Sequence, residues 1–233
     1  MLSVIRNVGT TKQNSGLLAK WGLKFSYPKP VFLIQYLISI FANDKTENII
    51  LDFFGGSATL GDAVLRQNAE DGKKRRYLLV QLPEKLSEEI GDAKHIASIA
   101  DIGKERMRKA GEYILSLGCH PDWNRDVGFR VLKVDTSNMK DIYYRPDELS
   151  QGDLLEAVDN VKPDRTPEDL LFQVLVDWGV DLTLPIRRES LHGKTVFFVD
   201  DNALVACFDT DITEELVKEL AKHEPLRVVF RDN

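Results

Sequence analysis

The chain alternates short, continuously apolar runs with longer stretches in which apolar residues recur at helical spacing. A first run, Asn48–Phe54, is followed by a helical pattern over Ala58–Glu70 and by a second run over Arg75–Glu84. Continuous apolar runs of this length are typical of strands that are buried in a parallel sheet. The sequence therefore predicts a βαβ unit with two buried strands.

Further elements are expected on both sides of this unit. Lys29–Asp44 is predicted as a helix with Pro30 in its first turn. His95–Gly118 has the pattern of a long amphipathic helix that ends at Gly118, and Gly128–Asp135 reads as a further strand. Residues 1–27 are polar and show little periodicity.

The pattern restarts after a polar stretch. Residues 136–165 are polar and interrupted by Pro146 and Pro163, so they are expected to form a linker. The elements predicted beyond it are a helix over Thr166–Gly179, two strands within Lys194–Phe208 that turn at Asp201–Asn202, a helix over Ile212–His223 and a last strand over Leu226–Asp232. The sequence thus predicts the α/β class, with a first domain over residues 1–149 and a small α/β module over residues 150–233.

Charge is unevenly distributed between these parts. Residues 1–146 hold 22 basic and 17 acidic residues, whereas residues 147–233 hold 9 and 20. This change of sign suggests two units with different neighbours. The basic residues within Gly72–Arg76 are expected to lie in a solvated turn, and Lys104, Arg106, Arg108 and Lys109 on an exposed helix face.

Other composition features limit the possible classes of protein. Cys119 and Cys207 have no paired spacing and the four histidines are scattered, so no metal site is expected. The longest apolar stretches are too short to span a bilayer, and no signal peptide pattern is seen. These features indicate a cytoplasmic protein with reduced thiols and no contact with a membrane.

The stretch "LDFFGGSATLGDAV", Leu51–Val64, carries the clearest candidate chemistry. A strand, Asp52, two glycines and a helix start are typical of a loop that holds a nucleotide or a cofactor. The stretch lacks the Gly-Lys-Ser/Thr of a P-loop and the spaced glycines of a dinucleotide fingerprint. The alternative is a tight turn between strand and helix that binds nothing.

This stretch resembles the S-adenosylmethionine loop of the amino-methylating DNA methyltransferases, whose pattern is close to D-x-F-x-G-S-G-T-T. Asp52, Phe54, Gly56, Ser57 and Thr59 match it, whereas Ala58 and Leu60 depart from it. "FSYPKPVFLI" resembles the Lys-Pro motif of the same enzymes, and "LLVQLPE" the strand after the loop in type III restriction–modification subunits. Later stretches, such as "KTVFFVDDNALVACFD", are similar to that subfamily too, so the resemblance covers nearly the whole chain.

The resemblance implies a Rossmann-like, S-adenosylmethionine-dependent methyltransferase sheet and a set of residues that bind the cofactor. Asp52 and the turn after it would surround the methionine part, Lys29 and its neighbours would approach the carboxylate, and Gln81 with Glu84 would reach the ribose. The complete set is Tyr27, Lys29, Pro30, Asp52, Phe53, Phe54, Gly55, Gly56, Ser57, Thr59, Gln81 and Glu84. The alternatives are a solvated loop carboxylate for Glu84 and a plain surface lysine for Lys29.

The resemblance also shows what this sequence lacks. The family binds the target amine with an Asp/Asn-Pro-Pro-aromatic motif that precedes the Lys-Pro motif in this subclass. The chain has no Pro-Pro dipeptide, and 29 residues precede Pro30. We therefore expect the C-terminal part of a type III modification (Mod) subunit, truncated or encoded by a split gene, with no catalytic residue of its own and no activity alone.

The family further implies that such a subunit methylates adenine N6, contacts DNA through the missing part and meets a restriction helicase–nuclease subunit. The acidic module is the expected contact for that subunit or for a second copy in a homodimer. Two other interpretations stay open. The chain could be a non-catalytic interaction subunit whose loop has decayed at Ala58, or part of a methyltransferase that acts on cytosine N4 or on RNA.

Overall fold

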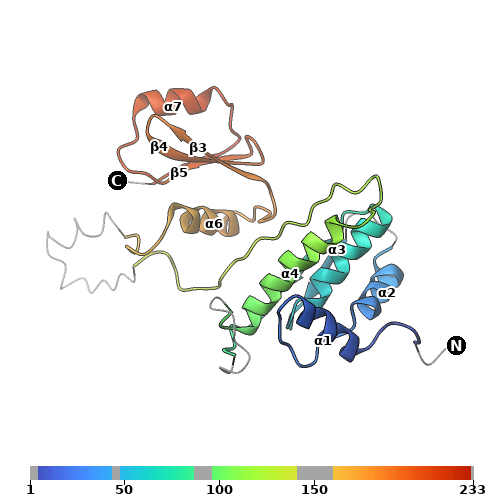
Figure 1. Ribbon diagram of the computed structural model, residues 1–233. Helices are drawn as coiled ribbons and strands as arrows, with labels where there is room; N and C mark the ends of the chain where they lie inside the picture. Colours follow the sequence, from blue (N-terminus) through green and yellow to red (C-terminus); the bar gives the residue numbers. More distant parts are fainter. Residues whose placement is uncertain (1–4, 44–47, 87–95, 141–159, 232–233) are drawn as a thin grey trace. The chain divides into compact units, whose positions relative to one another are not determined.

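A computed structural model describes residues 5–43, 48–86, 96–140 and 160–231. The chain forms two compact units, Met1–Phe129 and Arg130–Asn233 (Figure 1). Each unit is described by itself. The domain boundary predicted between residues 149 and 150 falls outside the described residues and stays a prediction.

The predicted βαβ unit is present in the first unit. Strand β1 (Ile49–Asp52) pairs in parallel with β2 (Arg76–Leu79), in a register that places Ile49 opposite Arg76 and Asp52 opposite Leu79. Helix α3 (Thr59–Asp71) connects them. Consecutive residues from Gly61 to Leu65 are buried on this helix, so α3 forms the centre of the unit.

The described part of this unit has three further helices, two of which pack against α3. Helix α2 (Val31–Phe41) contacts one side through a cluster that includes Val31, Ile38 and Val64. Helix α4 (Ile99–Leu115) contacts the other side through a cluster that includes Leu65, Met107 and Ile114. The third, α1 (Thr11–Lys20), lies in the segment whose polar sequence predicted no element, and it begins with a capping box between Thr10 and Gln13.

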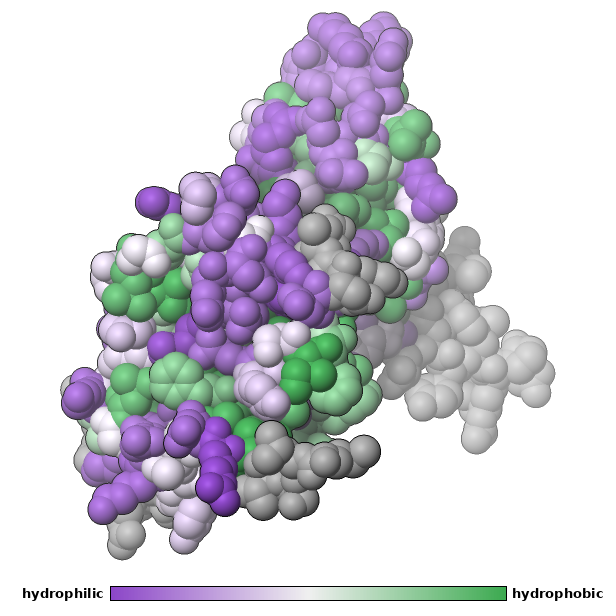
Figure 2. Space-filling model, turned by 90° about the vertical axis from the view of Figure 1, so that its right-hand side faces the viewer, coloured by the Kyte–Doolittle hydropathy of each residue, from purple (hydrophilic) through white to green (hydrophobic). Residues whose placement is uncertain are grey.

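The burial predicted for the two strands is wrong on one face. Ile49, Leu51, Leu78 and Val80 are exposed, whereas the alternate residues are half-buried. Side chains of a strand point to opposite faces in turn, and among the described residues the helices cover one face of this sheet only. Helix α2 also leaves apolar residues exposed, among them Phe32 and Phe41. Figure 2 shows apolar surface between polar side chains on the side of the molecule where α2 lies in Figure 1.

Three other expectations around these elements need correction. The segment Gly128–Asp135 forms no strand, because it pairs with none of the described strands. Helix α4 ends at the C-cap Ser116 in a right-handed conformation, before Gly118. Pro30 is the N-cap of α2 rather than a residue of its first turn.

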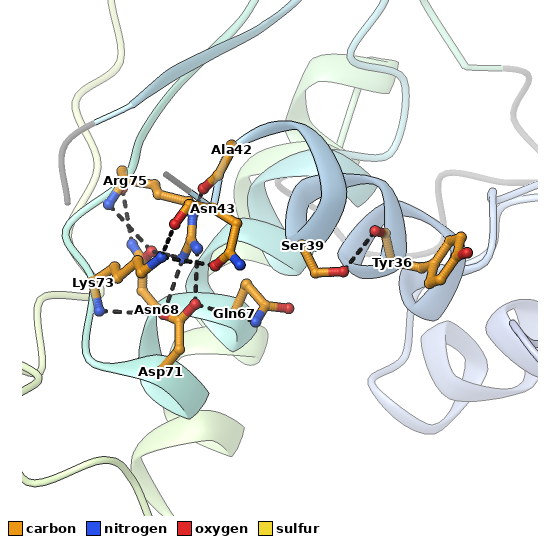
Figure 3. A network of polar contacts seen from close by, with 9 residues as sticks. All are labelled: Tyr36, Ser39, Ala42, Asn43, Gln67, Asn68, Asp71, Lys73 and Arg75. Atoms are coloured by element: carbon orange, nitrogen blue, oxygen red, sulfur yellow. Dashed lines mark hydrogen bonds and ion pairs between the residues drawn. The ribbon is translucent and has the colours of Figure 1, made fainter. Parts of the chain in front are cut away.

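Two arginines that the sequence suggested were solvated are buried. Arg75 joins the C-terminal ends of α2 and α3: it donates to the carbonyl of Ala42 at 2.8 Å, to Asn68 Oδ1 at 3.3 Å and to Asp71 Oδ2 at 2.7 Å (Figure 3). Burial acts to raise the pKa of Asp71, but its hydrogen bonds with Arg75 and the Lys73 amide outweigh burial and lower it. The second of these arginines is Arg106, described with the site below.

The second unit is a mixed four-stranded sheet between two helices. Its strands are β3 (Ile186–Leu191), β4 (Lys194–Val199), β5 (Leu204–Cys207) and β6 (Val228–Phe230), in the order β3-β4-β5-β6, and its helices are α6 (Pro167–Asp177) and α7 (Glu214–Ala221). Neighbouring strands are antiparallel except for β5 and β6, which are parallel. Phe197 packs on the side of α6 and Phe198 on the side of α7, so β4 is buried on both faces.

Both helices and three of the strands of this unit were predicted from the sequence. The N-terminal cap of α6 also agrees with its prediction in detail. The side chain of Thr166 caps the helix, Pro167 is its first residue and Asp169 completes a capping box. Strand β3 is the element that the sequence reading missed. It joins β4 through His192 and Gly193, which both have positive φ angles of 49° and 75°.

Candidate functional site

The glycine turn between β1 and α3 is held in place by bonds on both sides. The carboxylate of Asp52 accepts a hydrogen bond from the Phe54 amide at 2.9 Å, and the Gly55 amide donates to the carbonyl of Val80 at 3.0 Å. The Ala58 amide donates back to the carbonyl of Gly55 at 2.7 Å. These bonds fix the chain as it leaves the sheet and tie it to the end of β2.

Gly56 and Ala58 both adopt left-handed backbone conformations, with φ angles of 51° and 59°. The conformation is easy for glycine, whereas for alanine it costs about 1–2 kcal/mol. Ala58 is also the N-cap of α3 and makes no side-chain cap hydrogen bond. Amides in the first turn of a helix have no partner within the helix, so this end of α3 suits a negatively charged or polar ligand group.

Gln81 lies beside the turn rather than apart from it. Its Oε1 accepts a hydrogen bond from the Gly56 amide at 2.7 Å, and its Nε2 donates to the carbonyl of Leu82 at 3.1 Å. The residue that the resemblance placed at the ribose therefore also supports the glycine turn. Glu84 follows on the same segment, where its carbonyl accepts from the Ile99 amide at 3.0 Å, and its side chain is exposed.

The segment before α2 reaches the same turn. A Cβ atom on Gly56 would lie 3.9 Å from Cζ of Phe25. Lys29 is exposed, and its carbonyl accepts a short hydrogen bond from the buried side chain of Asn14 on α1. The helix that the sequence did not predict thus anchors the Lys29–Pro30 segment.

Aromatic side chains are exposed around this region. Tyr27 is 83% exposed and Phe54 85% exposed, and Phe53 is exposed as well. Contiguous exposed apolar patches, rather than single exposed residues, mark ligand sites and protein contacts. Phe53 and Phe54 belong to the turn itself, so exposed aromatic rings accompany its polar backbone.

Ser57 and Thr59 differ from the other predicted site residues that carry a side chain, because both are buried. Nη1 of Arg106, on α4, donates to Ser57 Oγ at 3.0 Å, to the Ser57 carbonyl at 3.2 Å and to Thr59 Oγ1 at 2.8 Å. Their hydroxyls therefore face the interior. That these two side chains also contact a cofactor stays a prediction.

Arg106 is itself paired with Asp62 of α3. Its Nε and Nη2 both donate to Asp62 Oδ2 at 3.1 Å, and Arg66 donates to the other carboxylate oxygen at 2.6 Å. Burial lowers the pKa of Arg106, while the charge and hydrogen bonds of Asp62 oppose this and favour the guanidinium. The expectation that Arg106 lies on an exposed helix face is wrong.

Arg106, Asp62 and Asn14 are the residues around the turn that the sequence reading missed. A signal for Arg106 exists in the helical period, since it lies four residues from both Ile102 and Ala110, which are on the buried face of α4. A charge on such a face requires a buried partner. Asn14 gives no comparable signal.

The structure contains no other obvious site among its described residues. No group of three or more histidine, cysteine, aspartate or glutamate side chains there could hold a metal ion. Within the same residues, no helix has the length and apolar character to cross a membrane.

Comparisons with known proteins identify relatives of the chain. No protein-family model matches it. It is 31% identical over 232 residues to the Mod subunit of the type III restriction–modification enzyme StyLTI from Salmonella typhimurium, a match to 86% of this chain and 34% of that protein. The Mod subunits of EcoP15I from Escherichia coli and of EcoPI from Escherichia phage P1 are 34% and 28% identical over 213 residues, and each match includes 88% of this chain.

The fold belongs to the α/β class, and its βαβ unit with a glycine turn is compatible with a methyltransferase-like fold. The chain belongs to the family of type III restriction–modification Mod subunits and corresponds to part of such a subunit. It spans about a third of the length of these relatives.

Proposed function

We propose that this chain is the S-adenosylmethionine-binding part of a Rossmann-like DNA methyltransferase that transfers a methyl group to adenine N6 in a type III restriction–modification system. The observation that carries the proposal is the glycine turn before α3. It combines a left-handed Gly56, a helix end without a side-chain cap and fixed contacts with Gln81 and Val80. The class of reaction, DNA methylation, is inferred from the similarity to Mod subunits.

The residues around the turn fit such a cofactor. S-adenosylmethionine supplies an electrophilic methyl group on a sulfonium centre. Backbone amides at the start of α3 would hold polar groups of its methionine part, and the exposed ammonium of Lys29 would approach the carboxylate. Gln81 and Glu84, which follow β2, would reach the ribose hydroxyls. Tyr27 and Phe54 offer exposed aromatic rings.

A titration of the 233-residue chain with S-adenosylmethionine tests this proposal. Gly56→Val should weaken binding at least tenfold, because its side chain enters the space above the turn. The same change also strains a left-handed backbone, so it needs a matched control. Gly22 has a φ of 77° and no atom within 4 Å of an added Cβ, and it lies after α1 rather than in the turn.

Gly22→Val should therefore unfold at a lowered temperature, as Gly56→Val does, and yet bind the cofactor as the wild type does. Isothermal titration calorimetry and thermal unfolding measure the two effects separately. Equal affinity of wild type and Gly56→Val would mean that the turn is only structural.

A non-catalytic interaction subunit is the second candidate. The left-handed Ala58 favours it, since a glycine at this position in the family pattern would avoid the strain. This candidate predicts that the wild-type chain does not bind S-adenosylmethionine at all, so the same titration separates the two functions.

We also infer that the chain needs a further polypeptide before it transfers a methyl group. The sequence has no Pro-Pro dipeptide to hold an amine. The apolar face of the β1–β2 sheet, formed by Ile49, Leu51, Leu78 and Val80, is exposed, and a two-stranded sheet rarely stands alone in water. The remaining part of a Mod subunit would cover this face and bring the base-binding motif and the DNA contacts. We further propose that the acidic second unit contacts a restriction subunit or a second copy of the chain.

A further inference from the structure

Arg106 is fully buried in the interior of the first unit, with a relative exposure of 0%. Its three nitrogens all donate hydrogen bonds. Two of them bind Asp62 on α3, and the third, Nη1, binds the hydroxyls of Ser57 and Thr59 and the carbonyl of Ser57. Arg106 thus connects α4 to the residues on both sides of Ala58.

Ala58 is the strained point of the turn. A left-handed alanine keeps its conformation only where the surroundings fix it. Here one guanidinium nitrogen holds the residue before it and the residue after it, at distances of 3.0 and 2.8 Å to the two hydroxyls. Gly103 closes the remaining side, since a Cβ there would lie 3.4 Å from both the Ala58 Cβ and the Gly56 carbonyl oxygen.

Asp62 keeps the guanidinium oriented. It is fully buried and accepts hydrogen bonds from Arg106 and from Arg66 through its two carboxylate oxygens. Burying an arginine is costly without such a partner, and the planar guanidinium reaches several acceptors at once where an ammonium cannot. The Arg106 guanidinium is therefore suited to fix the backbone conformation of the glycine turn as well as to fill space in the core.

We propose that Arg106 is a positioning residue for S-adenosylmethionine: held by Asp62, it fixes the glycine turn from beneath through Ser57 and Thr59, without touching the cofactor. The inference rests on the proposed function, because it assigns a supporting residue to the same site. It also assigns the Ser57 and Thr59 hydroxyls to the support of the turn.

The test is Arg106→Lys in the 233-residue chain. Lysine keeps a positive charge beside Asp62 but cannot also hold both hydroxyls. The affinity for S-adenosylmethionine should fall about tenfold, which corresponds to about 1.4 kcal/mol. Hydrogen exchange of the amides from Phe54 to Leu60 should become faster in the free protein. Ser57→Ala should weaken binding in the same direction, and the double variant should lose less than the sum of the two single changes.

Arg75→Lys is the matched control. Arg75 is buried in the same unit and binds the carbonyl of Ala42, Asn68 and Asp71 at the opposite end of α3 (Figure 3). This variant should lower the unfolding temperature as Arg106→Lys does. Its affinity for S-adenosylmethionine should stay within twofold of wild type, and exchange within Phe54–Leu60 should not change.

Each result of these binding and exchange measurements either supports or overturns the positioning role of Arg106. Wild-type affinity in Arg106→Lys, or an equal loss of affinity in both lysine variants, overturns the proposal. If the wild-type chain binds no S-adenosylmethionine, the proposed function fails, and hydrogen exchange then decides the positioning role by itself. In that case, unchanged exchange in Arg106→Lys overturns it, and faster exchange confined to the turn supports it.

Discussion

Single residues show where the sequence reading of this site succeeded and where it failed. Asp52, Gly55 and Gly56 were predicted to form a turn at the end of a strand, and the structure confirms that turn. The sequence predicts Arg106 on an exposed helix face, because a cation on a charged helix is usually solvated, and the structure buries it. The residue that holds it, Asp62, lies 44 positions away in the sequence, so a local pattern cannot reveal the pair.

Two helical glycines give a stability prediction at the same scale. Gly16 in α1 has no atom within 4 Å of an added Cβ, whereas a Cβ on Gly61 in α3 would lie 2.7 Å from Sδ of Met107. Alanine is the better helix former by about 0.5–1 kcal/mol. Gly16→Ala should therefore raise the free energy of unfolding by about that amount.

Gly61→Ala should instead lower the free energy of unfolding by about 1–2 kcal/mol, because the added methyl group displaces Met107 from the contact between α3 and α4. Urea unfolding followed by circular dichroism measures both values. A stabilising Gly61→Ala would show that the two helices are packed less closely than described.

Among the elements, those with a clear period or a clear cap were predictable. Helix α6 has Thr166 and Pro167 at its start, and β4 and β5 are continuously apolar. Helix α1 was missed because its segment is polar, and its buried residues are Asn14 and Leu18. Strand β3 was missed because Arg187, Arg188 and Glu189 interrupt its apolar positions, as an edge strand permits.

The cap of α4 gives a prediction about pH. The hydrogen bond from Lys104, with those from Ser98 and the Ala97 amide, outweighs burial and lowers the pKa of Asp101 to about 2. A carboxylate whose pKa is lower in the folded state stabilises the fold above its unfolded pKa of about 3.9. That stabilisation is lost as the pH falls through about 2.

Asp101→Asn should lower the free energy of unfolding by about 0.5–1 kcal/mol at pH 7, since it removes the ion pair with Lys104 and the charge at the start of α4. The difference from wild type should shrink between pH 4 and pH 2, within the window set by the two pKa values. Urea unfolding at a series of pH values measures it. A difference that stays constant over this range would mean that the charge of Asp101 contributes nothing.

The molecule as a whole consists of two units of different character. The first, Met1–Phe129, holds the candidate site, and the second, Arg130–Asn233, has its own core on both faces of a mixed sheet. The α/β class was predictable from the pattern of apolar runs. The half-exposed sheet of the first unit was not, because a continuous apolar run is expected to be buried on both faces, whereas the described helices cover only one face of this sheet.

Limited proteolysis tests the division into domains. The first cuts should fall within Asp135–Asp164, a polar stretch that contains Pro146 and Pro163. Mass spectrometry of the early fragments identifies the sites. A first cut within β4 or β5, with Asp135–Asp164 intact, would contradict the predicted linker.

Methyl transfer with and without the missing part tests the account of this chain most directly. The assay follows tritium from labelled S-adenosylmethionine into mixed-sequence duplex DNA. We expect no transfer by the 233-residue chain alone. Transfer should appear when a polypeptide with the Asp/Asn-Pro-Pro-aromatic motif of the family is added, and it should be lost in Gly56→Val but kept in Gly22→Val. Robust transfer by the chain alone, or complemented transfer that Gly56→Val leaves unchanged, would contradict the account.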